Sequence, residues 1–187
     1  MPSFVELRKR ASPLFGVACG LAAACSPVFN WREVPMPDGQ LLALLPCKPD
    51  RAERQLPLGN QAVLVNMAGC EAGGATFAVA QANAPDLAQA QDWMSAWRKQ
   101  AYAQWAGARV EESQVKVINA AAEIEPLRFD ASRPQAQSGS GGERSSLVWF
   151  GRRHRDGTFS LYQATILGKP ESQEAAETFF AGLHLSP

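Results

Sequence analysis

Apolar and polar side chains alternate with a period of two along several short stretches of this chain. Val63, Val65 and Met67 share one face of such a stretch, and Phe77 and Val79 share one face of the next. This period is typical of β-strands that bury one side of an antiparallel sheet. Together with neighbouring apolar runs, it predicts strands over residues 31–36, 41–45, 61–70, 75–81, 110–118, 124–130, 146–153 and 158–167.

Turn sequences join the predicted strands near both ends of this pattern. Pro37-Asp38-Gly39-Gln40 separates the first two strands, and Arg155-Asp156-Gly157 separates the last two. An aspartate followed by a glycine between two apolar runs is a hairpin signal. We therefore expect one hairpin at each place.

A helical period appears in two other segments. Ala84-Pro85-Asp86 opens the first, and Gly107 ends it. Its apolar side chains recur at three- and four-residue steps, at Leu87, Ala90, Met94, Trp97, Ala101 and Trp105. A shorter run follows Lys169-Pro170-Glu171, with Ala175, Phe179 and Leu183 one turn apart. The pattern predicts an α+β fold in which one long helix and a C-terminal helix cover an antiparallel β-sheet.

The length of 187 residues fits one domain with a short leader. Apolar residues make up 46% of the chain, which is enough for a hydrophobic core. We expect a single domain over residues 31–187. Within it, residues 131–143 are rich in serine, glycine and glutamine and are predicted to form a mobile loop.

The N-terminus has the pattern of an export signal. Arg8-Lys9-Arg10 is followed by a mostly apolar run, and small residues close the stretch at Ala22-Ala23-Ala24-Cys25-Ser26. The apolar run is shorter than the roughly 20 residues that a membrane-spanning helix needs. Residues 1–24 are therefore predicted to be an export signal and residues 25–30 a tether.

Leu21-Ala22-Ala23-Ala24-Cys25 resembles the lipobox of bacterial lipoproteins, although the leucine stands four residues before the cysteine instead of three. The resemblance implies cleavage before Cys25 and a lipid on its thiol. Because Ser26 follows, and not aspartate, it also implies the outer membrane. Two alternatives stay open, which are ordinary cleavage without a lipid and a chain that is not cleaved or not exported.

Two of the four cysteines remain after this assignment. Cys19 leaves with the leader and Cys25 carries the lipid, so Cys47 and Cys70 form the remaining pair. In an oxidising compartment such a pair predicts a disulfide. The spacing does not match a C-x-x-C redox motif, and the two histidines lie far away in sequence, so no metal site is expected.

The order of the predicted elements, with the segments "LLALLPCKPD", "GATFAVAQAN" and "SLYQATILGKPESQEAAETFFAGLHL", resembles the PsbP-like α/β sandwich over residues 31–187. The segments "FNWREV", "LLPCKPDRAERQLPLG" and "MAGCEAGGATFAVA" also resemble small proteobacterial envelope proteins of unknown function. Members of the superfamily mostly act as accessory or scaffold proteins. The resemblance therefore implies a binding role and supplies no catalytic residues.

Charge excludes one class of partner. The chain has 18 basic and 18 acidic residues; residues 1–24 contain three of the former and one of the latter, so 15 and 17 remain and the mature charge is −2. Nucleic-acid binding, which requires many phosphates to be neutralised, is not expected. No cofactor is expected either.

Two groups of residues are candidates for binding. Trp93 and Trp97 belong to the predicted long helix, where they either line a ligand groove or pack in the core. Arg152, Arg153, His154 and Arg155 cluster at a hairpin tip and suit an acidic partner or an anionic lipid surface. A hydrolase would require a serine or aspartate beside His154 or His184. No such arrangement is evident in the sequence, so no catalytic residue is predicted.

These features predict an exported and lipid-anchored accessory protein on the periplasmic side of a bacterial cell envelope, with an envelope protein as its partner. The alternative is a module that binds a small molecule or a lipid in a pocket between the long helix and the sheet.

Overall fold

Two antiparallel sheets and two helices make up the described part of the chain. The structure, a computed structural model, describes residues 28–134 and 142–187. The predicted export signal, Cys25 and the centre of the predicted loop 131–143 lie outside these ranges. The elements in chain order are β1 (Arg32–Pro35), β2 (Leu41–Leu45), β3 (Asp50–Leu58), β4 (Gln61–Ala72), β5 (Ala75–Ala84), α1 (Leu87–Gln104), β6 (Arg109–Gln114), β7 (Leu127–Ser132), β8 (Arg144–Arg153), β9 (Phe159–Gly168), α2 (Gln173–Ala181) and β10 (Leu183–Leu185).

The larger sheet has seven strands in the order β3-β4-β5-β9-β8-β7-β6, and the smaller has three in the order β1-β2-β10. Every pairing is antiparallel. The α+β class with antiparallel pairing is therefore confirmed. The prediction of one sheet is wrong, because the hairpin β1–β2 pairs with the C-terminal strand β10 and not with the larger sheet.

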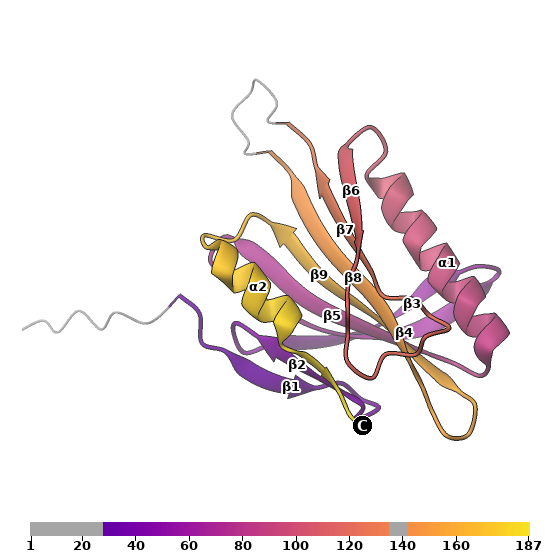
Figure 1. The fold of residues 1–187 in the computed structure, drawn as a ribbon. Helices are drawn as coiled ribbons and strands as arrows, with labels where there is room; N and C mark the ends of the chain where they lie inside the picture. The colour runs from indigo at the N-terminus through magenta and orange to yellow at the C-terminus, as the bar shows by residue number, and fades with distance from the viewer. Residues whose placement is uncertain (1–27, 135–141) are drawn as a thin grey trace, which may run out of the picture.

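The elements form three layers (Figure 1), with the larger sheet between α1 on one face and the smaller sheet and α2 on the other. The central strands are therefore buried on both faces. In β5, Ala80 and Ala82 belong to the core under α1, while Phe77 and Val79 belong to the core under α2. The larger sheet is buried on a single face only beyond the area that α1, α2 and the smaller sheet cover.

Side-chain caps explain where both helices begin. The carboxylate of Asp86 accepts from Gln89 N at 2.8 Å, and Ser172 Oγ accepts from Ala175 N at 3.0 Å. Each satisfies one backbone N–H that has no partner within its helix. The segment around Leu183 differs from the prediction, because α2 ends at Ala181 with Gly182 as its C-cap, and Leu183 already pairs with Ala43 in the smaller sheet.

Three strands also differ from the predicted pattern. β3 was not predicted; seven of its nine residues are exposed and four are charged, as suits the edge of a sheet. β6 ends at Gln114, earlier than expected, and residues 115–126 form a connection in which Ile118 is 70% exposed. β7 extends to Ser132, two residues into the predicted loop.

Cys47 and Cys70 form a disulfide with Cα atoms 6.0 Å apart, so this prediction is confirmed. Cys47 follows β2 of the smaller sheet, and Cys70 lies within β4 of the larger sheet. The bridge therefore joins the two sheets covalently.

The first described residues already contact the domain. The Phe29 ring stacks on Trp31, with centroids 5.9 Å apart, and meets Phe77 edge-on at 6.5 Å. Packing thus begins within the segment predicted to be a tether. No helix in the described ranges is long and apolar enough to span a membrane.

Candidate functional site

The predicted basic cluster at the β8–β9 hairpin is mostly engaged in internal contacts. Arg152 donates to Asn119 O at 3.1 Å, and Arg153 pairs with Glu123 at 3.1 Å. Both contacts hold the β6–β7 connection against the hairpin. Arg155 is exposed and makes none of the ion pairs observed in the described ranges.

His154 lies beside a serine, as a hydrolase would require. Its Nε2 is 2.8 Å from Ser160 Oγ, and Ser160 Oγ donates to Asn83 Oδ1 at 3.0 Å. A hydroxyl has one hydrogen, and Ser160 directs it to Asn83 Oδ1, so the contact with His154 corresponds to the tautomer that carries a hydrogen on Nε2. A general base needs that nitrogen unprotonated. This arrangement therefore uses His154 as a donor and fits a structural network.

Burial leads to the same interpretation. Ser160 is 0% exposed, so its hydroxyl is not presented to a substrate. Asp156, the nearby acid, accepts from Thr158 N and Oγ1 at 3.0 and 2.7 Å, and these bonds lower its pKa. His184 lies on β10 with an exposed side chain. No cluster of three potential metal ligands occurs among the described residues.

A second polar contact lies on the same side of the larger sheet. The Tyr162 hydroxyl donates to Asp38 Oδ2, and Asp38 Oδ1 accepts from Gln40 N at 3.0 Å. Burial, followed by the hydrogen bond to Asp38, raises the pKa of Tyr162. Asp38 and His154 line an open cleft of about 420 Å³. The Asp38–Tyr162 bond ties the β1–β2 turn to β9, so its evident role is to join the two sheets.

The tryptophans of α1 face the larger sheet. Trp93 is 7% exposed and Trp97 4%, and both belong to the core under this helix. Trp97 also lines a cavity of about 180 Å³ between the C-terminal half of α1 and strands β8 and β9. The complete lining is Trp97, Gln100, Ala101, Gln104, Trp105, Ser145, Leu147, Gln163, Thr165 and Leu167.

One wall of this cavity is an ordered chain of hydrogen bonds. Trp149 Nε1 donates to Gln163 Oε1 at 2.8 Å, and Gln163 Nε2 donates to Thr165 Oγ1 at 3.2 Å. Trp149 is fully buried and has only an N–H to donate, so it fixes which end of the Gln163 amide is oxygen. The glutamine and the threonine are therefore held in a defined orientation at the cavity.

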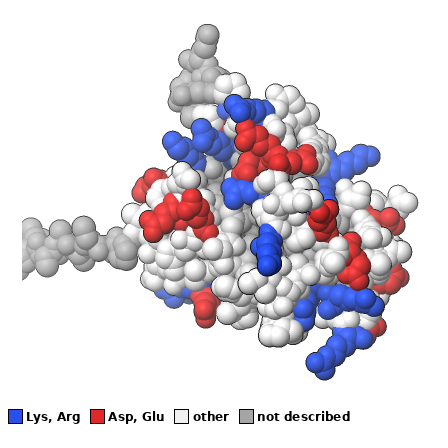
Figure 2. All heavy atoms as spheres, viewed as in Figure 1, with Lys and Arg blue, Asp and Glu red and all other residues white. Residues whose placement is uncertain are grey.

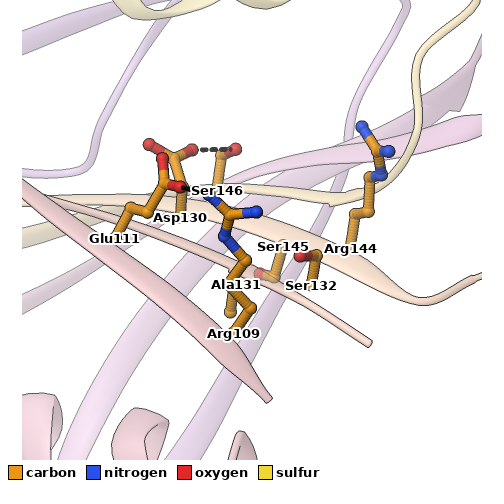
Figure 3. A pocket seen from close by; sticks show the side chains of 8 residues that line it. All are labelled: Arg109, Glu111, Asp130, Ala131, Ser132, Arg144, Ser145 and Ser146. Carbon is orange, nitrogen blue, oxygen red and sulfur yellow. Dashed lines mark hydrogen bonds and ion pairs between the residues drawn. The ribbon is translucent and has the colours of Figure 1, made fainter. Parts of the chain in front are cut away.

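A polar groove lies on the opposite face of the larger sheet, over β6, β7 and β8. Its volume is about 320 Å³, and Figure 3 shows Arg109, Glu111, Asp130 and Ser146 gathered at one side with Arg144 pointing away. Arg109 pairs with Glu111 at 2.7 Å, and Ser146 Oγ donates to Asp130 at 2.5 Å. Figure 2 shows basic and acidic side chains next to one another over these strands. The groove is polar and mixed in charge.

Gln163, Thr165 and Ser145 were not predicted as site residues from the sequence. A signal was present, because Gln163 and Thr165 occupy the positions of an apolar strand that share a face with Phe159 and Leu161. Polar residues at core-facing positions of a strand indicate either an internal network or a site.

Comparison with models of known protein families gives no match for this chain, and comparison with curated protein sequences gives none either.

Proposed function

We propose that this protein is an exported accessory protein of a bacterial cell envelope, anchored by a lipid on Cys25, that acts by binding another envelope protein and not by catalysis. The proposal includes the PsbP-like α/β sandwich as its fold. Residues 1–24 serve as the export signal, and the domain lies on the periplasmic side, at the outer membrane.

The observation that carries the proposal is the disulfide between Cys47 and Cys70. Disulfides persist in oxidising compartments and are rare in a reducing cytosol. This one adds a covalent link between two sheets that also meet through side-chain packing and the Asp38–Tyr162 hydrogen bond, and so it belongs to the architecture of the domain. A chain that depends on such a bridge is suited to work outside the cytoplasm.

The packing of Phe29 against the domain supports a short tether. Phe29 packs against Trp31 and Phe77, and Cys25 precedes it by four residues. At 3.3–3.6 Å per extended residue, four residues span at most about 14 Å. A lipid on Cys25 then holds the β4–β5 turn close to the membrane, because Phe29 lies against Gly73 in that turn.

The polar groove over β6–β8 is the surface proposed for the partner. Its side chains combine both charges, and paired opposite charges suit complementary side chains of a protein better than a uniformly anionic membrane. Arg144 makes none of the ion pairs observed among residues 28–134 and 142–187. It is therefore available to a partner carboxylate.

Intact-mass analysis of the protein from its native host, combined with membrane fractionation, tests the proposal. We expect a chain that begins at Cys25, carries acyl groups and contains one disulfide, and Cys25→Ser should release it from the membrane fraction.

The Arg144→Glu variant should lose cross-linking to its envelope partner, whereas Arg155→Glu, at an exposed arginine outside the groove, should retain it. A full-length chain in the cytoplasm with free thiols at Cys47 and Cys70 would refute the assignment.

A second candidate function is a small-ligand-binding module that uses the cavity between α1 and the larger sheet. The oriented amide and hydroxyl groups of Gln163 and Thr165 at this cavity favour it.

A further inference from the structure

The cavity under the C-terminal half of α1 is shaped as a small site with an open rim. Gln100, Gln104 and Leu167 are exposed at its edge. Trp97, within α1, and Trp105, the C-cap of α1, are buried and line its interior. Its volume of about 180 Å³ corresponds to about six waters at roughly 30 Å³ each. That is the size of one sugar ring and is smaller than a typical drug-sized pocket.

The lining contains no charged side chain, although 19% of the chain is charged. The nearest cation that the structure places against the lining is Arg133, whose guanidinium lies 4.8 Å from the Trp105 ring centroid and donates to Gln104 O. An ionic ligand would therefore find no charged partner within the lining itself. The lining instead combines two indoles with neutral hydrogen-bonding groups from glutamine, serine and threonine. The site chemistry thus selects an uncharged ligand.

The polar groups at the cavity have hydrogen-bonding capacity to spare. Thr165 Oγ1 accepts from Gln163, and within the described ranges no acceptor takes the hydrogen of its hydroxyl. Ser145 is 4% exposed, and its hydroxyl takes part in none of the side-chain hydrogen bonds of those ranges. An acyl chain in this cavity would leave both hydroxyl groups unpaired, at a cost to affinity.

We propose that this cavity binds one ring of a neutral sugar, an inference that rests on the second candidate function and names its ligand class. Sugar hydroxyl groups both donate and accept, so they match Ser145, Gln163 and Thr165. The C–H groups of the sugar ring contact the parts of Trp97 and Trp105 that line the cavity, beside the Arg133 guanidinium that lies over the Trp105 ring. The fixed amide of Gln163 offers its remaining N–H in one direction, which selects among ring stereoisomers.

The inference is tested by adding ligand to the protein in the form found in its native host and following the indole N–H signals in ¹H–¹⁵N spectra. The probes are millimolar N-acetylglucosamine, glucose and, separately, laurate. We expect a neutral sugar to shift the signals of Trp97 and Trp105 in a saturable manner while leaving Trp93, which does not line the cavity, unchanged. Thr165→Val should weaken sugar binding about tenfold, as expected for loss of one hydrogen bond.

Two further variants make the test independent of the threonine. Ala101→Leu fills the cavity without removing a polar group and should abolish binding, while Thr76→Val, a half-buried threonine on β5 outside the lining, should leave it unchanged. Saturable binding of laurate without sugar binding would overturn the sugar assignment and keep the ligand-binding module. Unshifted Trp97 and Trp105 signals with every probe would overturn both.

Discussion

At the scale of single residues, burial and hydrogen bonding decide which polar groups are structural. His154 and Ser160 have the residue types of a catalytic pair, yet their hydrogen bonds run from His154 to Ser160 and on to Asn83. The hydroxyl of Tyr162 is likewise committed to Asp38. For Tyr162, burial and the bond to Asp38 raise the pKa, because ionisation would place a charge where water cannot solvate it.

The two tyrosines of the chain provide a test of this effect. Burial, with Glu112 as the next cause, raises the pKa of Tyr102 to about 12, and the pKa of Tyr162 is raised as well. A raised pKa in the folded state means that stability is complete below the unfolded value of about 10 and falls as pH rises from there towards 12. A spectrophotometric titration should show little tyrosinate near pH 10. Tyr102, which is 37% exposed, should ionise towards pH 12, and the fully buried Tyr162 should ionise together with loss of native circular dichroism. Two tyrosines that ionise near pH 10 in a native spectrum would contradict this.

At the scale of elements, the junction of α2 and β10 shows how closely the smaller sheet is packed. Gly182 ends the helix, and its carbonyl oxygen accepts from Leu44 N at 3.0 Å. A Cβ at Gly182 would lie 2.3 Å from the Cβ of Leu44, an atom that cannot rotate away. A glycine is therefore required here by space and not by an unusual φ.

We expect Gly182→Ala to destabilise the fold by roughly 1–3 kcal/mol, the usual cost of forcing extra volume into a packed site. Urea unfolding followed by circular dichroism measures the change. The same substitution should cost less in a Leu44→Gly background, which lacks the opposing Cβ, and such coupling is the signature of direct contact. Equal costs in the two backgrounds would show that the close approach is not the reason for the glycine.

At the scale of the whole molecule, three layers are held together by side-chain packing, by hydrogen bonds such as that between Tyr162 and Asp38, and by one covalent bridge. The smaller sheet and α2 lie on the larger sheet through a core that includes Phe77, Phe150 and Phe179. The Cys47–Cys70 bridge, with 23 residues of separation, is located where the chain passes from one sheet to the other.

Replacing both cysteines, as Cys47→Ser with Cys70→Ser, should lower the free energy of unfolding by roughly 3 kcal/mol, because the bridge restricts the unfolded chain. The wild-type protein under reducing conditions should lose a similar amount. Urea unfolding of the oxidised, reduced and substituted forms measures both. An unchanged midpoint in the double variant would mean that the two sheets hold together without the bridge.

Local pattern was sufficient for the elements with a strong period or a clear boundary. The period of Leu87 to Trp105 placed α1, and Asp38-Gly39 and Asp156-Gly157 placed two hairpins, because these signals act within a few residues of the chain. Counting cysteines was sufficient for the Cys47–Cys70 pair. β3 was not predicted, because an edge strand can be charged on both faces and then shows no alternation of apolar and polar residues.

Which elements meet was decided by the tertiary structure. The separation into two sheets depends on β10, three residues long, returning to β2 from the far end of the chain, and no local period encodes a partner so distant. The cavity formed in the same way, since Trp97 and Thr165 come together only when α1 packs across β8 and β9. Periodicity indicates which face of a helix or strand is buried. Which distant segments come into contact depends on how the apolar faces of all the elements pack together in one fold.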